Sequence, residues 1–469
     1  MKQGAFSLAI LSGVVSTASA ALEVDFASAD SIRAAAKDVA FDAVSYYNGN
    51  ETGEVPGMLG YEPYAGGKYW WWSGSVLMST LIDYWHYTND NSYNALVSQG
   101  LLHQRGPNND YMPPNYTASL SNEDQGFWGL AAMQAAELNF PASSIDWSNL
   151  SLNVWDTQVW RFEQEERDET CNGGLRWQVP PTNVGYNYKN TISNAVFINL
   201  SARLGRWTGN ATYAEWAERT WTWLTNVGYI TEDFRVYDGA HVEQNCTDIN
   251  KAQFSYNAGV LLQSAAFLYN QTTGDDQKRW RDRVTGLTNA ILDTFFEDGY
   301  HFEIACEGRD GACTSDMLFF KGMVTRFLAS TVQVAPYTKE SITKVLKTNA
   351  EAAVKTCTGG DNSRQCSFSW AKSKFHNETD IPSQLNALSA LSVLLQDEVS
   401  QKGIATNATS SPNDGSEEGN GSGSNGGGNG NGGQGQGQNG NDNGNGGSAG
   451  TTTRVTVGVL VACLFAALL

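Results

Sequence analysis

Two adjacent carboxylic acids at the start of an apolar stretch are the first candidates for chemistry in this chain. They are Glu123 and Asp124, in the segment SLSNEDQGFWGLAAMQAAEL that runs from Ser119 to Leu138. Two carboxyl groups that flank a glycosidic bond are the minimum for its hydrolysis, because one protonates the leaving oxygen and the other attacks the sugar or activates water. Neighbouring residues can hold their carboxyl groups about 5 Å apart, which suits the retaining reaction rather than the inverting one.

The same residues also fit the polar start of a helix without any catalytic role. Asn122 is a good helix cap and Gln125 stands three residues later, so the two form a capping box. The helix dipole would lower both pKa values, whereas a general acid needs a raised pKa, and repulsion between two close carboxylates can keep one of them protonated. The two interpretations are compatible, since a capped helix end can present both acids to a cleft.

Three further segments concentrate polar and aromatic side chains, which suit the faces and hydroxyl edges of sugar rings. The candidate ligand-binding residues are Asp238 and His241 in RVYDGAHVEQNCTDINKAQFSYNAG, Trp177, Tyr188, Lys189 and Asn190 in CNGGLRWQVP and NYKNTISN, Trp72 in KYWWWSGS, and Trp128 beside the acid pair. For each of them singly, ordinary packing, a turn or a solvated loop is the alternative. The sequence shows no serine elbow, phosphate loop or zinc signature, and we expect neither a metal nor a cofactor.

The elements that must position these residues repeat along the chain. An apolar helix, a break and a second helix recur around DYWHYTNDNSYNAL, GRWTGNATYAEWA and FLYNQTTGDDQKRW, where a helix stop is followed closely by a helix start. The apolar helices are expected to begin near Trp72, Asn122, Ser193, Ser255, Phe319 and Pro382. Their spacing of roughly 60 residues indicates repeated units of two helices each.

The pattern inside these helices predicts how they pack. In AVFINLSARL the residues Val196, Leu200 and Leu204 line one face, whereas TYAEWAERTWTWL separates apolar and charged positions onto opposite faces. Apolar inner helices and amphipathic outer helices predict an all-α (α/α)6 toroid of six helical hairpins, with an open helical solenoid as the alternative. In a toroid, the loops at one set of helix ends form a bowl, where the polar candidates should gather.

The two ends of the chain are not expected to belong to this fold. Residues 1–20 have the charge, apolar run and Ala18-Ser19-Ala20 cleavage site of a secretory signal peptide. Residues 404–450 are a Gly/Asn/Ser-rich segment that predicts a flexible tether, and residues 451–469 fit a glycosylphosphatidylinositol (GPI) attachment tail that is removed. A short single-pass anchor is the alternative, although its apolar run of about 15 residues falls below the roughly 20 that a span needs. The folded domain is therefore expected at 21–403.

Cysteine usage indicates an oxidising compartment. Once Cys463 leaves with the tail, six cysteines remain, and an even set in a secreted chain indicates disulfides with 15 possible connectivities. The short loops Cys306–Cys313 and Cys357–Cys366 are the easiest to close, which would leave Cys171 with Cys246. A metal site is the alternative, but no Cys-x-x-Cys or His-x-x-x-His spacing supports it.

Charge and glycosylation signals indicate a surface glycoprotein. The formal net charge of -19 argues against a nucleic-acid partner, since neutralising phosphates takes Lys and Arg. Glycans are expected at acceptor sequences that begin at Asn50, Asn115, Asn149, Asn210, Asn245, Asn270 and Asn377, with further acceptors at Asn407 and Asn420. The acceptor at Asn199 lies in an apolar helical pattern, and we do not expect it to be used.

These segments resemble glycoside hydrolase family 76, the α-1,6-mannanase-like enzymes, and in particular its fungal GPI-anchored branch that acts in cell-wall assembly. The resemblance is carried by SNEDQGFWGLAAMQAAE, CNGGLRWQV, NYKNTISNAVFINLSARL, VYDGAHVEQNCTDINKAQFSYNAG and the FFKG of Phe319–Gly322. It implies the (α/α)6 toroid and a retaining mechanism, with Glu123 as nucleophile and Asp124 as acid/base. It also implies that Asp238 binds mannose hydroxyls. The family's acid pair is usually Asp-Asp, so the glutamate is a departure that adds a methylene of reach.

The resemblance also implies partners and a location. The substrate would be a mannose-containing glycan, either α-1,6-mannan or the mannose core of the GPI glycan, and wall glucan would be a possible acceptor. A sugar hydroxyl can replace water in resolving a covalent intermediate, so a retaining enzyme can act as a transglycosidase. The chain would pass through the secretory pathway to the outer face of the plasma membrane and the cell wall, attached to the membrane by its GPI anchor. The alternatives are a non-catalytic mannoglycan-binding wall protein and an enzyme for another wall polysaccharide.

Overall fold

A computed structural model of the chain describes residues 21–60, 68–141, 145–168, 170–309, 312–376, 379–399 and 403–407. The expected signal peptide, the GPI tail and nearly all of the expected tether lie outside these residues. The described residues all belong to one compact unit, whose main elements are twelve α-helices. Among the described helices, none combines the length and the apolar character that crossing a bilayer requires.

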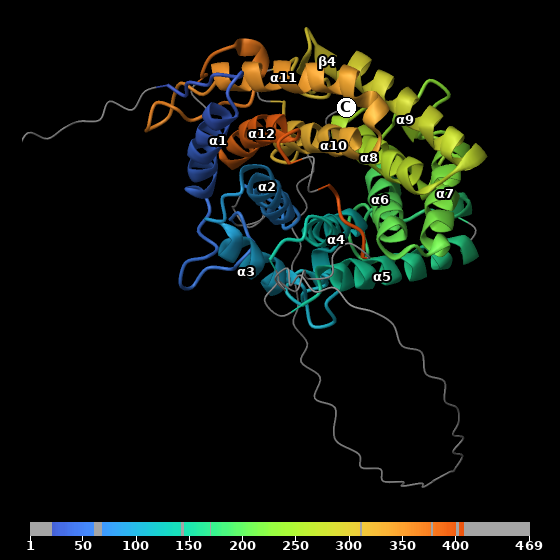
Figure 1. Ribbon diagram of the computed structural model, residues 1–469. Helices are drawn as coiled ribbons and strands as arrows, with labels where there is room; N and C mark the ends of the chain where they lie inside the picture. The colour runs from blue at the N-terminus through green and yellow to red at the C-terminus, as the bar shows by residue number, and fades with distance from the viewer. Residues whose placement is uncertain are drawn as a thin grey trace, which may run out of the picture. The chain divides into compact units, whose positions relative to one another are not determined.

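Six helices form a closed inner ring, which confirms the predicted toroid and excludes the open solenoid. Each packs against the next along the chain, and the last packs against the first (Figure 1). They are α2 (Ser73–Thr88), α4 (Asn122–Glu137), α6 (Thr191–Thr208), α8 (Ser255–Gln271), α10 (Phe320–Val334) and α12 (Ile381–Ser392). Every one begins within two residues of its predicted start.

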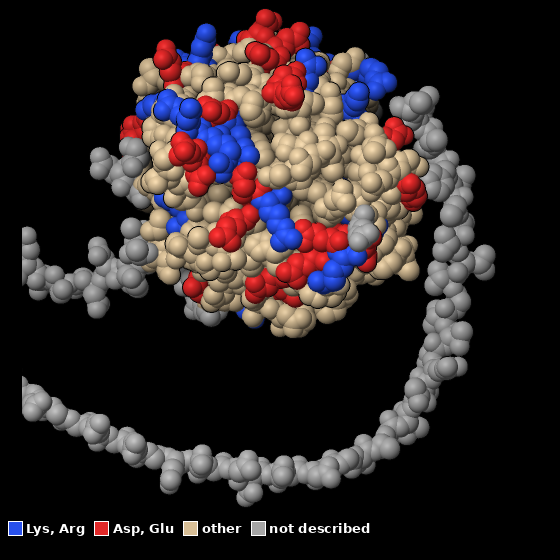
Figure 2. Space-filling view, turned by 90° about the vertical axis from the view of Figure 1, so that its right-hand side faces the viewer, with Lys and Arg blue, Asp and Glu red and all other residues tan. Residues whose placement is uncertain are grey.

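A second ring of helices surrounds the first. It consists of α1 (Ala29–Val44), α3 (Asn94–Gln104), α5 (Trp147–Arg167), α7 (Ala211–Asn226), α9 (Gly274–Phe295) and α11 (Lys339–Lys355). Helix α1 packs against α12, and each of the others packs against the inner helix that precedes it. Acidic and basic side chains lie interspersed on the face shown in Figure 2. Between two outer helices, Glu218 of α7 pairs with Arg279 and Arg283 of α9.

The inner helices are buried nearly all round and approach one another closely. Val196, Leu200 and Leu204 of α6 have no exposed surface, as their spacing predicted. Gly126 of α4 faces α6 so tightly that a Cβ atom there would lie 2.2 Å from Cγ1 of Val196. A side chain at this position would force the two helices apart, so the small residues beside the acid pair are a packing requirement.

Short strands cover the N-terminal end of α6. Strands β1 (Tyr188–Asn190), β2 (Gly239–His241) and β3 (Ile249–Asn250) form an antiparallel sheet in that order, with Asn190 opposite Gly239. Strand β1 continues directly into α6, so the sheet places its residues at the start of an inner helix. Strands β4 (Phe296–Glu297) and β5 (Tyr300–His301) form a second hairpin. The described 3₁₀ turns are η2 (Thr117–Ser119), η3 (Thr170–Asn172), η4 (Val242–Gln244), η5 (Met317–Phe319), η6 (Pro336–Thr338), η7 (Trp370–Lys372) and η8 (Val393–Leu395).

The last described segment lies at the opposite ends of the inner helices. The Ala405 N–H donates to the carbonyl of Glu137, the last residue of α4, at 2.8 Å. Arg206 near the end of α6 donates to the carbonyl oxygens of Ile404 and Ala405 at 2.7 and 2.8 Å. Packing therefore continues past Gly403, where the domain was expected to end.

The three predicted disulfides are present, joining Cys171 to Cys246, Cys306 to Cys313 and Cys357 to Cys366. Among the predicted glycosylation acceptors, those exposed to solvent are Asn50, Asn115, Asn149, Asn210, Asn245, Asn270 and Asn407. The amide nitrogen of Asn270 is already bonded to the Val334 carbonyl at 3.0 Å. Asn377 and Asn420 lie outside the described residues, and Asn199 is fully buried, as its pattern predicted.

Candidate active site

The acid pair lies in the first turn of an inner helix. Glu123 and Asp124 are the second and third residues of α4, so both project from the end of the ring where the loops gather. The helix cap is Ser121, whose Oγ accepts the Asp124 N–H at 3.0 Å. The predicted capping box is therefore wrong: Asn122 is already inside the helix, and the Gln125 side chain bonds outside this turn.

Asn190 holds the carboxyl group of Glu123. Its Nδ2 donates to Glu123 Oε2 at 2.7 Å, while its Oδ1 accepts the Ser193 N–H at 3.3 Å and thereby caps α6. We expected Asn190 to face a ligand, but it is 5% exposed and its amide is used by Glu123 and the helix cap. These contacts position the carboxyl group of Glu123, and a direct contact of Asn190 with a ligand stays a prediction.

The surroundings of Glu123 favour its protonated form. Burial raises the pKa of Glu123 well above its ordinary value, and the negative charge of Asp124 raises it further. The Asn190 donor opposes this effect by stabilising the carboxylate. Two close carboxyl groups in one site cannot both be charged without cost, which is the arrangement that a general acid requires.

Asp238 lies on the sheet side of the pair. It immediately precedes β2, and its Oδ2 accepts the Tyr188 hydroxyl at 2.7 Å and Nδ2 of Asn250 at 3.2 Å. Burial raises the pKa of Asp238, whereas Tyr188, Asn257 and Asn250 act in the opposite direction by favouring its charged form. Asp238 and Tyr188, which were predicted separately, thus bond to each other, and the charge of Asp238 raises the pKa of Glu123.

Three aromatic rings, those of Tyr256, Phe320 and Phe127, pack on one another and form what we call the aromatic floor. Tyr256, the second residue of α8, stacks on Phe320 with ring centroids 3.9 Å apart and on Phe127 at 6.4 Å. Burial raises the pKa of Tyr256 well above its ordinary value, so its hydroxyl remains a hydrogen-bond donor. The charges that raise it further are those of Glu123, Asp238, Asp316 and Asp124. The charges of four carboxyl groups therefore act on one phenol.

Asp316 is the acid that sequence reasoning missed. It lies just before η5 and α10, and Trp72 Nε1 donates to its Oδ1 at 2.9 Å. Burial raises the pKa of Asp316 to about 6, and the Trp72 bond limits the rise. Trp72 was expected to line a sugar cleft, but it is 6% exposed and reaches the pocket only through this indole N–H.

The remaining aromatic candidates separate into core and rim. The prediction that Trp128 binds a sugar is wrong, because the residue is 0% exposed and both Trp71 and Tyr111 stack on it with ring centroids 5.6 Å apart. Trp177 is partly exposed and His241 exposed, and the His241 ring lies edge-on to Tyr188 at 4.9 Å. These two stay candidates for the rim of the bowl.

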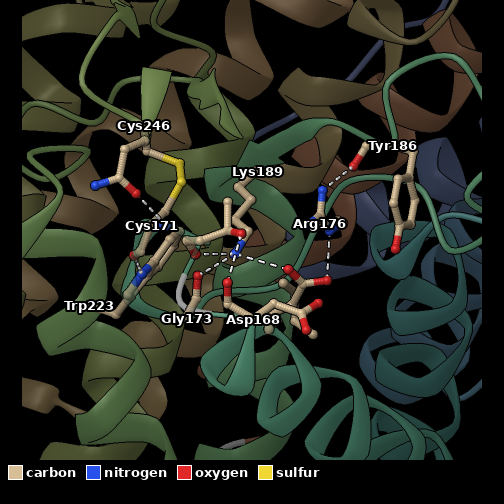
Figure 3. A network of polar contacts seen from close by, with 12 residues as sticks. Asp168, Cys171, Gly173, Arg176, Tyr186, Lys189, Trp223 and Cys246 are labelled. Carbon is tan, nitrogen blue, oxygen red and sulfur yellow. Dashed lines mark hydrogen bonds and ion pairs between the residues drawn. A yellow bond between two sulfur atoms is a disulfide. The ribbon is translucent and has the colours of Figure 1, made fainter. Parts of the chain in front are cut away.

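Lys189 is a structural residue, which corrects its predicted role in substrate binding. It is 0% exposed and its Nζ lies within a polar network (Figure 3). There it donates to the carbonyl oxygens of Thr170 at 2.8 Å and Gly173 at 2.7 Å, and it pairs with Glu165 at 3.1 Å. Burial without enough compensation lowers its pKa to about 8.

The network around Lys189 fixes a strained loop and, through it, the strand that carries Asn190. Cys171, Asn172, Gly173 and Gly174 all adopt positive φ angles, a conformation that non-glycine residues rarely adopt. The disulfide of Cys171 ties this loop to Cys246 after η4 (Figure 3). The register of β1, and with it the Asn190 amide, depends on these buried contacts.

One positional rule could have found part of what was missed. Tyr256 and Asn257 are the second and third residues of α8, the same positions that Glu123 and Asp124 hold in α4. First-turn positions of inner helices face the bowl in both cases, and the start of α8 was predicted correctly. Within the described residues, no group of three or more His, Cys, Asp or Glu side chains could hold a metal ion.

Comparisons with known proteins give a consistent family. The family model described as Glycosyl hydrolase family 76 matches residues 31–408. The chain is 38% identical to a mannan endo-1,6-alpha-mannosidase, DCW1, of Candida glabrata, over 86% of this chain and 88% of that protein. It is 37% identical to the DCW1 protein of Saccharomyces cerevisiae that carries the same enzyme name, over 79% and 80% of the two chains.

Solved structures share the architecture. The crystal structure of Dfg5 from Chaetomium thermophilum in complex with glucosamine matches with a TM-score of 0.78 and 52% identity, over 83% of this chain and 95% of that one. An inactive variant of an α-1,6-mannanase from Salegentibacter sp., in complex with α-1,6-mannotriose, matches with a TM-score of 0.62 and 16% identity, over 78% and 99%. The second likeness concerns the fold alone.

Proposed function

Because the chain belongs to glycosyl hydrolase family 76, we propose that it is a cell-wall α-mannosidase and transglycosidase that works with retention. Its substrate is α-1,6-mannan or the mannose core of a GPI glycan, and it transfers GPI-linked proteins to wall glucan. The observation that carries the proposal is the adjacent pair Glu123–Asp124, which Asn190 orients at the aromatic floor opposite Asp238. The mannan endo-1,6-alpha-mannosidase names of the yeast relatives supply the substrate class.

In this mechanism the two acids divide the work. Glu123 attacks the anomeric carbon, while Asp124 protonates the leaving oxygen and later deprotonates the incoming hydroxyl. The Asn190 donor favours the charged form of Glu123 that attack requires. Tyr188 holds Asp238 in place to bind mannose hydroxyls. When a hydroxyl of wall glucan replaces water in the second step, the result is transfer instead of hydrolysis.

A second assignment exchanges the two acids. Since burial raises the pKa of Glu123 and so favours its protonated form, Glu123 would be the general acid and Asp124 the nucleophile. Both assignments need the same pair and the same retaining chemistry. They differ only in which carboxyl group becomes bonded to the sugar.

Location follows from the same proposal. The signal peptide, the Gly/Asn/Ser-rich tether and the GPI tail expected from the sequence would place the enzyme on the outer face of the plasma membrane. The last described residues leave the fold at the ends of α4 and α6 that are remote from the acid pair. An anchor that follows this segment would leave the bowl open to wall glycans.

The test uses a soluble protein spanning residues 21–407 and an aryl α-1,6-mannobioside as substrate. Asp124→Asn and Glu123→Gln should each lower turnover by about 10²–10⁴-fold, the usual contribution of such a group. Azide then separates the roles: a variant without its acid/base gives the α-mannosyl azide, and a variant without its nucleophile gives the β-mannosyl azide. Unchanged turnover in both variants contradicts the proposed function.

A non-catalytic wall protein is the alternative that the Glu123 departure favours. If the wild-type protein binds α-1,6-mannotriose but cleaves no mannan or GPI-glycan substrate, while Glu123→Asp restores turnover, the chain is a mannoglycan-binding protein. The alternative of a different polysaccharide substrate is tested by product analysis on a panel of wall glycans. Hydrolysis releases free mannooligosaccharides, whereas transfer lengthens the glucan acceptor.

A further inference from the structure

Asp316 faces the pocket of the acid pair but has no part in the proposed mechanism. It lies just before η5 and α10, on the α10 and α2 side of the ring, whereas Asp238 lies on the side of β2 and α8. Its partner Trp72 packs on Phe127 of α4, the helix that carries the acid pair, with ring centroids 5.3 Å apart, and the charge of Asp316 also raises the pKa of Glu123. Asp316 is thus joined to the start of α2 and Asp238 to β1, which leads into α6, and α2 and α6 are the inner helices that pack on α4.

Packing fixes one oxygen of this carboxyl group. Trp72 Nε1 donates to Asp316 Oδ1 at 2.9 Å, and the indole ring is wedged between Phe127 at 5.3 Å and Phe319 at 5.6 Å. Phe127 stands one helical turn after Glu123 on α4, so it shares a helix face with the acid. Asp316 is thus positioned relative to the acid pair by a rigid aromatic contact.

The other oxygen is left for a ligand. A carboxylate has two oxygens with about four acceptor sites, and within the described residues no hydrogen bond reaches Oδ2 of Asp316. The side chain keeps a partial opening to solvent. Holding an acid in a largely buried position with one donor is costly, unless a further donor reaches it in the working complex. A sugar hydroxyl is such a donor, and a carboxylate binds it with a strong, charge-assisted bond.

We propose that Asp316 is a substrate-binding residue of the active site, whose Oδ2 accepts a hydrogen bond from a hydroxyl of the mannose unit at the acid pair. Asp316 and Asp238 then hold this sugar from two sides above Tyr256, and Trp72 sets the position of Asp316. The inference rests on the proposed function, because it takes Glu123 and Asp124 as the reacting centre.

Binding to an inactive protein tests this role without turnover. The probe is α-1,6-mannotriose, titrated calorimetrically into Asp124→Asn and into Asp124→Asn/Asp316→Asn. Loss of a hydrogen bond to a charged group should make the dissociation constant of the second protein about 10- to 100-fold larger. The control is Asp124→Asn/Asp298→Asn, which makes the same change at an exposed turn residue with φ 51°, a conformation that asparagine adopts readily. Its affinity should equal that of Asp124→Asn.

Each outcome is decisive. Equal affinity with and without Asp316→Asn, in a protein that melts no lower than Asp124→Asn, overturns the inference and leaves the proposed function standing. If Asp316→Asn does not fold, Trp72→Phe in the Asp124→Asn background takes its place, since it keeps an aromatic ring and removes the donor; unchanged affinity there overturns the inference as well. Turnover by Asp124→Asn alone at the wild-type rate, or its failure to bind mannotriose, overturns the proposed function instead.

Discussion

The side chain of Asn190 connects Glu123 to the start of the next inner helix. Its Nδ2 donates to Glu123 Oε2 at 2.7 Å, and its Oδ1 caps α6 by accepting the Ser193 N–H at 3.3 Å. Burial and Asp124 raise the pKa of Glu123, whereas the Asn190 donor favours the carboxylate. One amide therefore sets both the place of an inner helix and the proton affinity of the acid pair.

Replacing Asn190 with serine should shift the pH dependence of the reaction. Serine keeps the helix cap but is too short to reach Glu123, so the carboxylate loses its donor and the pKa of Glu123 rises further. The limb of the kcat/KM profile that reports Glu123 should move to higher pH. This is the acid limb if Glu123 is the nucleophile and the alkaline limb if it is the general acid.

The control for this prediction is the melting temperature, because a working serine cap should hold it near the wild-type value. Asn190→Ala removes both functions, so it should lower the melting temperature as well as shift the profile. A profile of Asn190→Ser that coincides with the wild-type profile at every pH would show that the 2.7 Å contact has no influence on catalysis.

Asp316 should make the protein less stable at neutral pH than at mildly acidic pH. Its pKa is about 6 in the folded protein and about 3.9 in an unfolded chain, so the folded state binds more protons between these values. Stability contributed by this group therefore falls as pH rises from about 4 to about 6 and stays low above. Asp316→Asn should melt at a higher temperature than wild type at pH 7.5.

The difference in melting temperature between the two proteins should shrink as the pH is lowered to 4.5. Asp316 of the folded wild type is then increasingly protonated, so its buried charge no longer destabilises the folded state. Thermal melts of both proteins at matched ionic strength measure it. A melting temperature of Asp316→Asn at or below that of wild type at pH 7.5 would contradict the raised pKa.

The ring could be predicted from the sequence because its signals are local. Apolar periodicity and helix breaks placed the six inner helices within two residues of their observed starts. The acid pair was found for the same reason, since adjacent acids at a helix start form a pattern within one segment. The cap was misplaced from Ser121 to Asn122, because several residues of that turn are good caps and only the backbone decides among them.

The rest of the site depends on contacts between segments far apart in the sequence. Asp316 and Trp72 are 244 positions apart, and nothing in TSDMLFF marks its aspartate as more than a loop acid. Lys189 and Asn190 are neighbours on one strand, so their side chains point to opposite faces, one to a buried network and the other to Glu123. From the sequence, both residues were predicted to bind a ligand, because polarity alone does not reveal which face of the strand is covered by the rest of the protein.

Lys189→Met should destabilise the fold strongly although it removes no catalytic group. Methionine has a similar length but cannot pair with Glu165 or donate to the carbonyl oxygens of Thr170 and Gly173. Glu165 keeps its ion pair with Arg176 at 2.7 Å, but two carbonyl oxygens lose the donor that satisfies them, which costs about 1–3 kcal/mol of unfolding free energy for each that stays buried. Urea unfolding followed by circular dichroism measures the loss.

A matched control is Lys339→Met, which makes the same change at a lysine paired with Asp397 on the surface, where the two side chains are 50% and 63% exposed. Exposed pairs contribute little, so its unfolding free energy should change by less than about 1 kcal/mol. Equal costs for the two lysines would mean that the network in Figure 3 does not stabilise the fold.

The long disulfide should stabilise the protein more than the short one. Cys171 and Cys246 are 75 positions apart, whereas Cys306 and Cys313 are 7 apart. In the chain-entropy account, the cross-link that closes the longer loop removes more freedom from the unfolded chain, about 4 kcal/mol against about 2 kcal/mol. The long link also anchors the positive-φ loop beneath β1, so its loss should affect both stability and the placement of Asn190.

Paired Cys→Ala variants separate these effects. Cys171→Ala/Cys246→Ala should unfold at a lower urea concentration than Cys306→Ala/Cys313→Ala under non-oxidising conditions. Because β1 carries Asn190, the first variant should also shift the Glu123 limb of the pH profile in the same direction as Asn190→Ser. If the short-loop variant is the less stable of the two, loop closure does not govern these links. If the first variant keeps the wild-type profile, the disulfide stabilises the loop without setting the position of Asn190.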